Sequence, residues 1–217
     1  MKELLPGILA TTPKQLKEQL DRVKWAPKIH IDIMDGKFVK TKTIQALTLK
    51  KYLPKAQLQI HLMANKPHKY IKTYSRLGAA EFIIHSEATE HSCETLEEIR
   101  LAGMKSGLAF NPETKVGYHS HSLVHADLAL VMTVHPGLFG QTFLKTPLHK
   151  IEEIRKINPL INIGLDGGVN LANARLASAA DFCIATNAVT LTPNPKEAYQ
   201  ELLDRMCHQA YKSRNAR

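Results

Sequence analysis

Short apolar runs recur along the chain at intervals of about two dozen residues, and each is followed by a stretch in which apolar positions repeat with helical periodicity. This alternation is typical of βα units that build a parallel sheet. The pattern predicts strands over residues 5–10, 28–35, 57–63, 82–87, 106–111, 128–134, 162–166 and 181–186. It predicts helices over residues 13–23, 43–52, 67–77, 93–102, 147–157, 171–178 and 195–211, with a weak one near His121.

Eight strands, each followed by a helix, within 217 residues are what a compact (β/α)₈ barrel requires. Thr12-Pro13, Thr146-Pro147 and Asn194-Pro195 each place a capping residue before proline at an expected helix start. The alternative is an open doubly wound sheet, but no GxGxxG or GxxxxGK[ST] turn follows a strand. We therefore expect an α/β fold, a TIM barrel formed as a single domain by residues 1–217, with a basic C-terminal tail from about residue 212.

The composition favours a folded protein outside the membrane. Apolar residues make up 44% of the chain, enough to build a core, and no run approaches the roughly 20 apolar residues of a membrane span. The N-terminus lacks the apolar core of a signal peptide. Cys93, Cys183 and Cys207 are far apart and form no CxxC pair, which argues against a disulfide framework. We expect a cytoplasmic protein with no membrane partner.

Lysine and arginine outnumber aspartate and glutamate by 29 to 20, which gives a formal charge of +9. These charges are spread along the chain without a basic stripe interleaved with aromatic residues, so we expect no nucleic-acid partner. An anionic small molecule remains a possible partner. Lys37, Lys40 and Lys42 follow the second predicted strand and are interpreted either as solubilising residues or as charge that compensates an anionic substrate.

Polar residues interrupt three of the apolar runs. In the second run, period-2 alternation places His30 and Asp32 on one face and isoleucines on the other, so both polar side chains should point into a barrel. The third run contains His61 in the same alternation, and the seventh ends at Asp166. Two imidazoles and two carboxylates would form a ligand set suited to Zn²⁺ or Fe²⁺. The alternative is four separate buried polar groups satisfied by their neighbours.

Five segments then resemble the ribulose-phosphate 3-epimerase family, in register from about residue 5 to about residue 205. They are HIDIMDGKFV (30–39), IHLM (60–63), GLAFNP (107–112), VMTVHPG (131–137) and LDGGVN (165–170). The resemblance implies a TIM barrel that inverts C3 of a ketose phosphate and that assembles as a homo-oligomer, either a dimer or a hexamer. It implies one bound divalent ion, Zn²⁺ or Fe²⁺ with Mn²⁺ or Co²⁺ as alternatives.

The resemblance also assigns roles to individual residues. It implies that Asp32 and Asp166 exchange the C3 proton and that His30, Asp32, His61 and Asp166 bind the metal. It implies substrate contacts from His61, Gly137, Gly140, Gly167, Gly168 and Asn187. Met34, Met63 and Met132 resemble the thioether lining of the family, although a space-filling role is an equal interpretation.

The chain departs from the family pattern where phosphate and substrate are recognised. Phe139 replaces a glycine of the Pro-Gly-Phe-Gly-Gly-Gln segment, Thr186-Asn187 replaces Gly-Ser, Gly7 replaces a serine, and Lys40-Thr41 replaces Pro-Asn. We expect D-ribulose 5-phosphate and D-xylulose 5-phosphate as the substrate pair. The alternatives are a hexulose 6-phosphate or other ketose phosphate, and a catalytically silent binding protein. The histidines at 119, 121 and 125 are interpreted as a surface cluster, and His85 as a residue beside the site at most.

Overall fold

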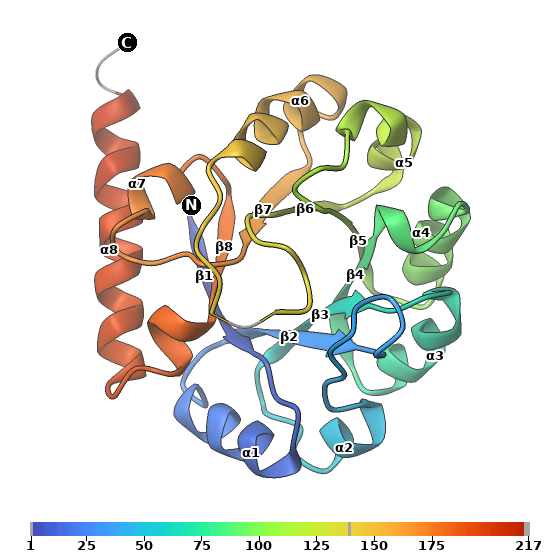
Figure 1. The fold of residues 1–217 in the computed structure, drawn as a ribbon, viewed down its shortest axis with the longest axis horizontal. Helices are drawn as coiled ribbons and strands as arrows, with labels where there is room; N and C mark the ends of the chain where they lie inside the picture. Colours follow the sequence, from blue (N-terminus) through green and yellow to red (C-terminus); the bar gives the residue numbers. More distant parts are fainter. Residues whose placement is uncertain (1, 139, 215–217) are drawn as a thin grey trace.

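A closed barrel of eight parallel strands forms the centre of the protein, and helices surround it (Figure 1). The computed structural model describes residues 2–138 and 140–214. The strands follow one another in chain order: β1 (Glu3–Ile8), β2 (Lys28–Met34), β3 (Gln57–Met63), β4 (Ala79–His85), β5 (Lys105–Phe110), β6 (Leu128–Met132), β7 (Asn162–Asp166) and β8 (Phe182–Ala185). The predicted fold class is therefore confirmed.

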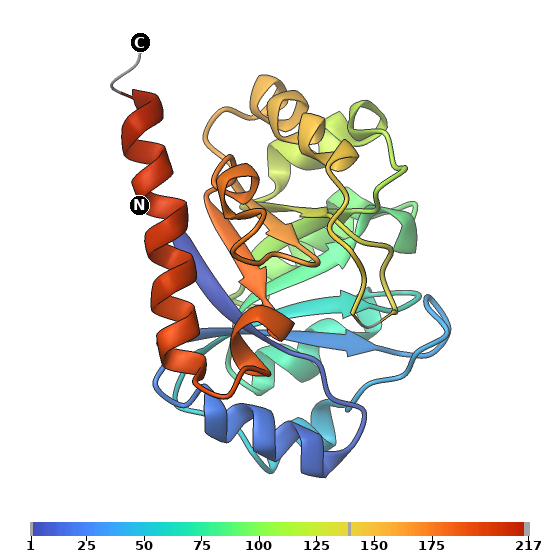
Figure 2. The same cartoon turned by 60° about the vertical axis from the view of Figure 1, so that its left-hand side comes forward.

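The helices alternate with the strands as expected. They are α1 (Pro13–Arg22), α2 (Ala46–Lys50), α3 (His68–Arg76), α4 (Ser92–Leu101), α5 (Ser120–His125), α6 (His149–Ile157), α7 (Ala174–Ala177) and α8 (Pro195–Arg214). Short turns η1 (Ser86–Ala88), η2 (Val116–His119) and η3 (Thr146–Leu148) and the π-helical turn η4 (Thr186–Thr190) complete the chain. The long α8 packs beside α7 and β1 (Figure 2).

Helices α2 and α7 begin three residues later than predicted because loop side chains bind nearby backbone groups. The hydroxyl of Thr43 donates to the Asp32 carbonyl and accepts from the Met34 N–H, so the chain joins α2 only at Ala46. Asn173 accepts from the Asn170 N–H and donates to the Gly168 carbonyl, which keeps the residues before α7 in a turn. These polar residues satisfy backbone groups of the loops at the barrel mouth.

The predicted helix starts are correct in two cases of three. Thr12 accepts from the Gln15 N–H and caps α1, and α8 begins at Pro195. Thr146-Pro147 instead opens η3, and α6 begins only at His149. The tail from residue 212 ends in residues 215–217, which lie outside the described residues.

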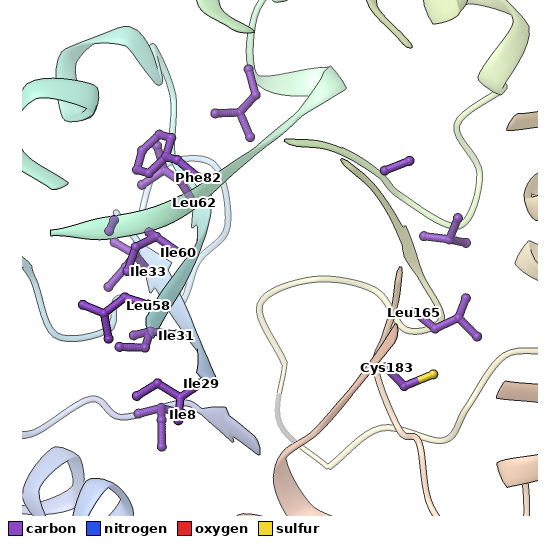
Figure 3. Packing of buried hydrophobic residues seen from close by; sticks show 14 of the residues in the cluster. Ile8, Ile29, Ile31, Ile33, Leu58, Ile60, Leu62, Phe82, Leu165 and Cys183 are labelled. Carbon is purple, nitrogen blue, oxygen red and sulfur yellow. The ribbon is translucent and has the colours of Figure 1, made fainter. Parts of the chain in front are cut away.

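The two faces of β2 have different surroundings, as the alternation predicts. Ile29, Ile31 and Ile33 are fully buried in the shell between barrel and helices. Figure 3 shows them beside Ile60 and Leu62 of β3 on the same side of the sheet. His30 and Asp32, on the opposite face, point into the barrel. The register pairs Asp32 with His61 and Met132 with Asp166, which brings the three polar ends to the carboxyl-terminal mouth.

The interior of the barrel is divided into a polar and an apolar part. The inward side chains of β2, β3 and β4 are largely polar. Ile83 of β4 joins a compact apolar group from the other strands that fills the remainder; the group consists of Leu5, Ile83, Ala109, Leu128, Leu130, Met132, Phe182 and Ile184. Among the described residues, none of the helices is both long and apolar enough to serve as a membrane span.

Candidate active site

Four polar residues converge at the mouth of the barrel, from β2, β3 and β7. One donor atom from each of His30, Asp32, His61 and Asp166 lies within 4.8 Å of the others, and all four side chains are buried. Nδ1 of His61 is 2.9 Å from Oδ1 of Asp32 and 3.2 Å from Oδ2 of Asp166. Nε2 of His30 is 3.3 Å and 3.6 Å from the same two oxygens. The structure thus brings together the four predicted metal ligands.

The electrostatics of this cluster favour a cation at its centre. Burial lowers the pKa of His30, but the neighbouring Asp166 and Asp32 carboxylates outweigh burial and raise it to about 10. Burial raises the pKa of Asp166, but His30 and His61 outweigh burial and hold it below the usual range. Two buried carboxylates at one point therefore require positive charge, which imidazolium or a metal ion can supply.

The donor set fits a divalent ion. Nε2 of His30 is buried without a hydrogen-bond partner among the described residues, and it faces the two carboxylates. A buried polar atom without a partner is costly unless a ligand satisfies it. Two imidazole nitrogens and two carboxylate oxygens match the preferences of Zn²⁺ and Fe²⁺. These four residues can therefore hold the metal.

A cavity of about 600 Å³ opens above the cluster, within the range of small-ligand sites. The carboxylates of Asp32 and Asp166 line it, together with Met34, Met63 and Met132. His30 and His61 lie behind the carboxylates, and neither is among the lining residues. Because His61 does not line the cavity, its predicted contact with the substrate stays a prediction.

The glycines expected to contact substrate all line the cavity, as does Asn187. Gly137, Gly140, Gly167 and Gly168 have positive φ angles of 94°, 68°, 119° and 68°. A Cβ at Gly168 would lie 2.9 Å from the Phe143 backbone nitrogen, so this turn requires glycine for space as well as conformation. Phe139, the residue that replaces a family glycine, lies outside the described residues.

Two of the departures from the family pattern lie against each other. A Cβ added to Gly7 would be 2.0 Å from Oγ1 of Thr186 and 3.0 Å from Cγ2 of Ile184. Thr186 lines the cavity, so its hydroxyl occupies the space that a side chain at position 7 would need. The loss of a hydroxyl on β1 is thus accompanied by a hydroxyl at the end of β8.

The three loop lysines do not line the cavity, whereas Lys145, Asn170 and Asn173 do. Sequence reasoning missed these three residues because each lies in a loop whose path depends on packing. The surface histidines at 119, 121 and 125 are not part of the candidate metal cluster found among the described residues.

A hydrogen-bond chain behind His30 was also missed. Nδ1 of His30 lies 2.6 Å from Oε1 of Gln59, and Nε2 of Gln59 donates to Glu81 at 2.6 Å. Lys28 in turn lies 2.9 Å from Glu81. Strand β4 was predicted to begin at Phe82, but it begins at Ala79, because Lys28 and Gln59 satisfy the charge of Glu81 inside the barrel.

Comparisons with known proteins agree with this geometry. The model of the ribulose-phosphate 3 epimerase family matches residues 3–190. The chain is 34% identical over 213 residues to ribulose-phosphate 3-epimerase of Bacillus subtilis (strain 168), covering 93% of this chain and 98% of that protein. It is 33% identical over 215 residues to the Escherichia coli (strain K12) protein of the same name, covering 93% and 96%.

Solved structures share the fold at lower identity. A crystal structure of KGPDC from Streptococcus mutans, solved as a ligand complex, matches with a TM-score of 0.71 at 15% identity, covering 95% of this chain and 98% of that chain. A 3-hexulose-6-phosphate synthase matches with a TM-score of 0.69 at 15% identity, covering 94% and 99%. These similarities establish the barrel architecture.

Proposed function

The chain belongs to the ribulose-phosphate 3-epimerase family, and from this premise we propose that it interconverts D-ribulose 5-phosphate and D-xylulose 5-phosphate by inverting C3. The observation that carries the proposal is the pair of buried carboxylates, Asp32 and Asp166, which face one cavity from two non-adjacent strands. As a family member the chain is an isomerase that acts on carbohydrates.

Inversion at C3 requires one group to remove the proton from one face and another to return a proton to the opposite face. Asp32 and Asp166 are suited to this because they share a site in which their ionisation is coupled, so one can be ionised while the other carries a proton. In the forward direction one carboxylate accepts the C3 proton and the other donates; in the reverse direction their roles exchange.

The chemistry that a bound divalent ion supplies here is Lewis-acid stabilisation of negative charge on the ketose oxygens. His30, Asp32, His61 and Asp166 would hold this ion, with Zn²⁺ or Fe²⁺ proposed and Mn²⁺ or Co²⁺ as alternatives. Met34, Met63 and Met132 give the cavity a polarisable apolar wall that keeps water from the reacting carbon.

Phosphate recognition is proposed at the loops that follow β6, β7 and β8 and line the same cavity. Gly140, Gly167 and Gly168 allow backbone N–H groups to approach an anion closely, and Asn187 adds a side-chain donor. The partner is thus a ketose phosphate. Assembly as a dimer or hexamer, the cytoplasmic location and the lack of nucleic-acid and membrane partners remain predictions.

A second candidate substrate is a hexulose 6-phosphate. It is favoured by the absence of a side chain at Gly7 and the presence of a larger one at Thr186, which together reshape one wall of the cavity. Values of kcat/KM measured across pentulose and hexulose phosphates would distinguish the two, because the preferred substrate should exceed the other by at least tenfold.

The test is NMR in D₂O with metal-loaded protein and D-ribulose 5-phosphate. Deuterium should enter C3 as xylulose 5-phosphate forms. Asp32→Asn and Asp166→Asn should each abolish inversion, and each should retain exchange with at most one of the two epimers, while metal content is measured in parallel. Glu97→Gln, on the exposed face of α4, is the control that should keep full turnover. Metal binding without exchange on any ketose phosphate would instead support the catalytically silent alternative.

A further inference from the structure

An imidazole–carboxylate pair, His85 with Glu87, lies behind His61 on the side away from the metal cluster; the imidazole is buried, and the carboxylate is partly open to solvent. Nε2 of His61 is 2.8 Å from Nε2 of His85, the last residue of β4, and the two rings stack with centroids 4.9 Å apart. Nδ1 of His85 is 3.3 Å from Oε2 of Glu87 in η1. His85 is fully buried, and the ring of Phe38 covers it at 5.0 Å. Neither His85 nor Glu87 belongs to the four-residue cluster.

The geometry of this chain fixes where its protons lie. Nδ1 of His61 faces Asp32 and Asp166, so it must be unprotonated to bind a metal ion, and the ring proton must then be on Nε2. Nε2–H of His61 donates to Nε2 of His85, which leaves the His85 proton on Nδ1, facing Glu87. Glu87 must therefore accept a hydrogen bond from Nδ1–H of His85, which requires an oxygen atom facing Nδ1.

The surroundings of Glu87 hold its carboxylate in place. Its other oxygen, Oε1, accepts from the Asn111 backbone N–H at 2.9 Å and from the Thr114 hydroxyl. The Asn111 N–H is a donor that cannot change direction, so the carboxylate stays bridged between β5 and His85. A carboxylate that receives one fixed backbone donor and one hydroxyl on Oε1 remains free to accept from His85 on Oε2.

We propose that His85 and Glu87 are positioning residues that keep His61 in the tautomer with an unprotonated Nδ1 and thereby set the affinity of the site for a divalent cation. The proposal rests on the metal site of the proposed function. Hydrogen bonds of this kind typically change metal affinity 10- to 100-fold when they are removed. His30 is fixed independently, because Gln59 must present its oxygen to His30 while its amide donates to Glu81.

The structure predicts an ordered series of variants. His85→Leu removes the acceptor for His61 and should weaken Zn²⁺ binding 10- to 100-fold. His85→Gln can accept from His61 and donate to Glu87, so it should bind within about threefold of wild type. Glu87→Gln should weaken binding as much as His85→Leu. The single side-chain oxygen of the new glutamine would accept from the Asn111 N–H, so its NH₂ group would face Nδ1 of His85. Nδ1 of His85 would then have to accept a hydrogen bond, and the His85 proton would move to Nε2, where it faces His61.

The first experiment is competition of each purified full-length variant against a fluorescent chelator for Zn²⁺, with circular dichroism as a check on folding. Glu94→Gln is the matched control, since this exposed carboxylate on α4 lies 4.0 Å from His91, a histidine outside the site that precedes the helix. Wild-type affinity in both His85→Leu and Glu87→Gln would overturn the proposal. Failure of the wild-type chain to bind Zn²⁺, Fe²⁺, Mn²⁺ or Co²⁺ would overturn the metal site as well, which separates the two failures.

The second experiment observes the tautomers directly. Long-range ¹H–¹⁵N NMR of the Zn²⁺-loaded protein should show His85 protonated at Nδ1 and His61 protonated at Nε2. The same spectrum of His85→Gln should retain the His61 signal. A His85 ring protonated at Nε2 in the loaded wild-type protein would contradict the proposed order of protons and overturn the proposal.

Discussion

The close approach of Gly7 and Thr186 predicts that side chains at these two positions exclude each other. Gly7 lies in β1 without a positive φ angle, so a side chain there meets only a spatial obstacle. In Gly7→Ser the new Cβ would be 2.0 Å from Oγ1 of Thr186, 3.2 Å from Cβ of Thr186 and 3.0 Å from Cγ2 of Ile184. Rotation of Thr186 about χ1 would move Oγ1 but would leave the close contacts with Cβ of Thr186 and Cγ2 of Ile184.

The magnitude follows from these contacts. Insertion of atoms into a filled site costs about 1–3 kcal/mol, so Gly7→Ser should lower stability by about 2 kcal/mol. For a chain of this length that corresponds to a decrease in Tm of about 4–8 °C. Thr186→Gly removes the closest atom, Oγ1, together with Cβ, and should itself cost about 1 kcal/mol. In that background only the contact with Ile184 remains, and Gly7→Ser should cost less than about 0.5 kcal/mol.

The assay is a double-mutant cycle of Gly7→Ser, Thr186→Gly and the double variant, measured by urea unfolding and thermal unfolding. The expected coupling energy is about 1.5 kcal/mol in favour of the double variant. Additive effects, with a coupling below about 0.3 kcal/mol, would show that Thr186 does not occupy the space beside Gly7. The same four proteins, assayed on ketose phosphates, would also show whether the position of the hydroxyl changes substrate preference.

Three further predictions concern charged groups in and beside the site. Burial raises the pKa of Glu87, but His85, Thr114 and the backbone outweigh burial and lower it to about 2. The stability that the Glu87 carboxylate contributes is therefore complete above about pH 4.5 and is lost as the pH falls towards 2. In Glu87→Gln the free energy of urea unfolding should depend less on pH over that range. A divalent ion at 100 times its dissociation constant should stabilise the fold by about 2.7 kcal/mol, and its removal by a chelator should lower Tm by about 5–10 °C. Lys28→Met should cost about 3–5 kcal/mol in thermal unfolding because it leaves Glu81 unpaired, and Lys28→Met/Glu81→Leu should recover part of that loss.

The barrel and the four-residue cluster were predictable from the sequence because both depend on periodicity. Alternation along β2 determines that His30 and Asp32 face the interior, and parallel strands bring their carboxyl ends together. Glu81 was not predictable in the same way, since a charge inside an apolar run argues for a strand boundary. Its place in the barrel depends on Lys28 and Gln59, which lie on two other strands and are far from it in sequence.

The loops at the mouth were less predictable for a related reason. The position of a loop lysine relative to the cavity depends on the path of the backbone, and this path is set by contacts such as Asp35 with the N–H groups of Lys37 and Phe38. Local sequence shows the charge of Lys37, Lys40 and Lys42 but not that path. Lys145 lines the cavity instead, because the segment between β6 and α6 passes along the cavity wall.

The hydrogen bonds of the polar half of the barrel bear on whether the site binds a cation. From Lys28 through Glu81 and Gln59 to His30, every link pairs a donor with an acceptor. The chain ends at Nε2 of His30, which has no hydrogen-bond partner among the described residues although it lies 3.3 Å and 3.6 Å from the Asp32 and Asp166 carboxylates. An imidazole nitrogen that faces two carboxylates without a hydrogen bond leaves the buried network incomplete, and an incomplete buried network costs more than an apolar core. The break therefore lies at the one position where an added cation completes the network, beside the two carboxylates that face the cavity.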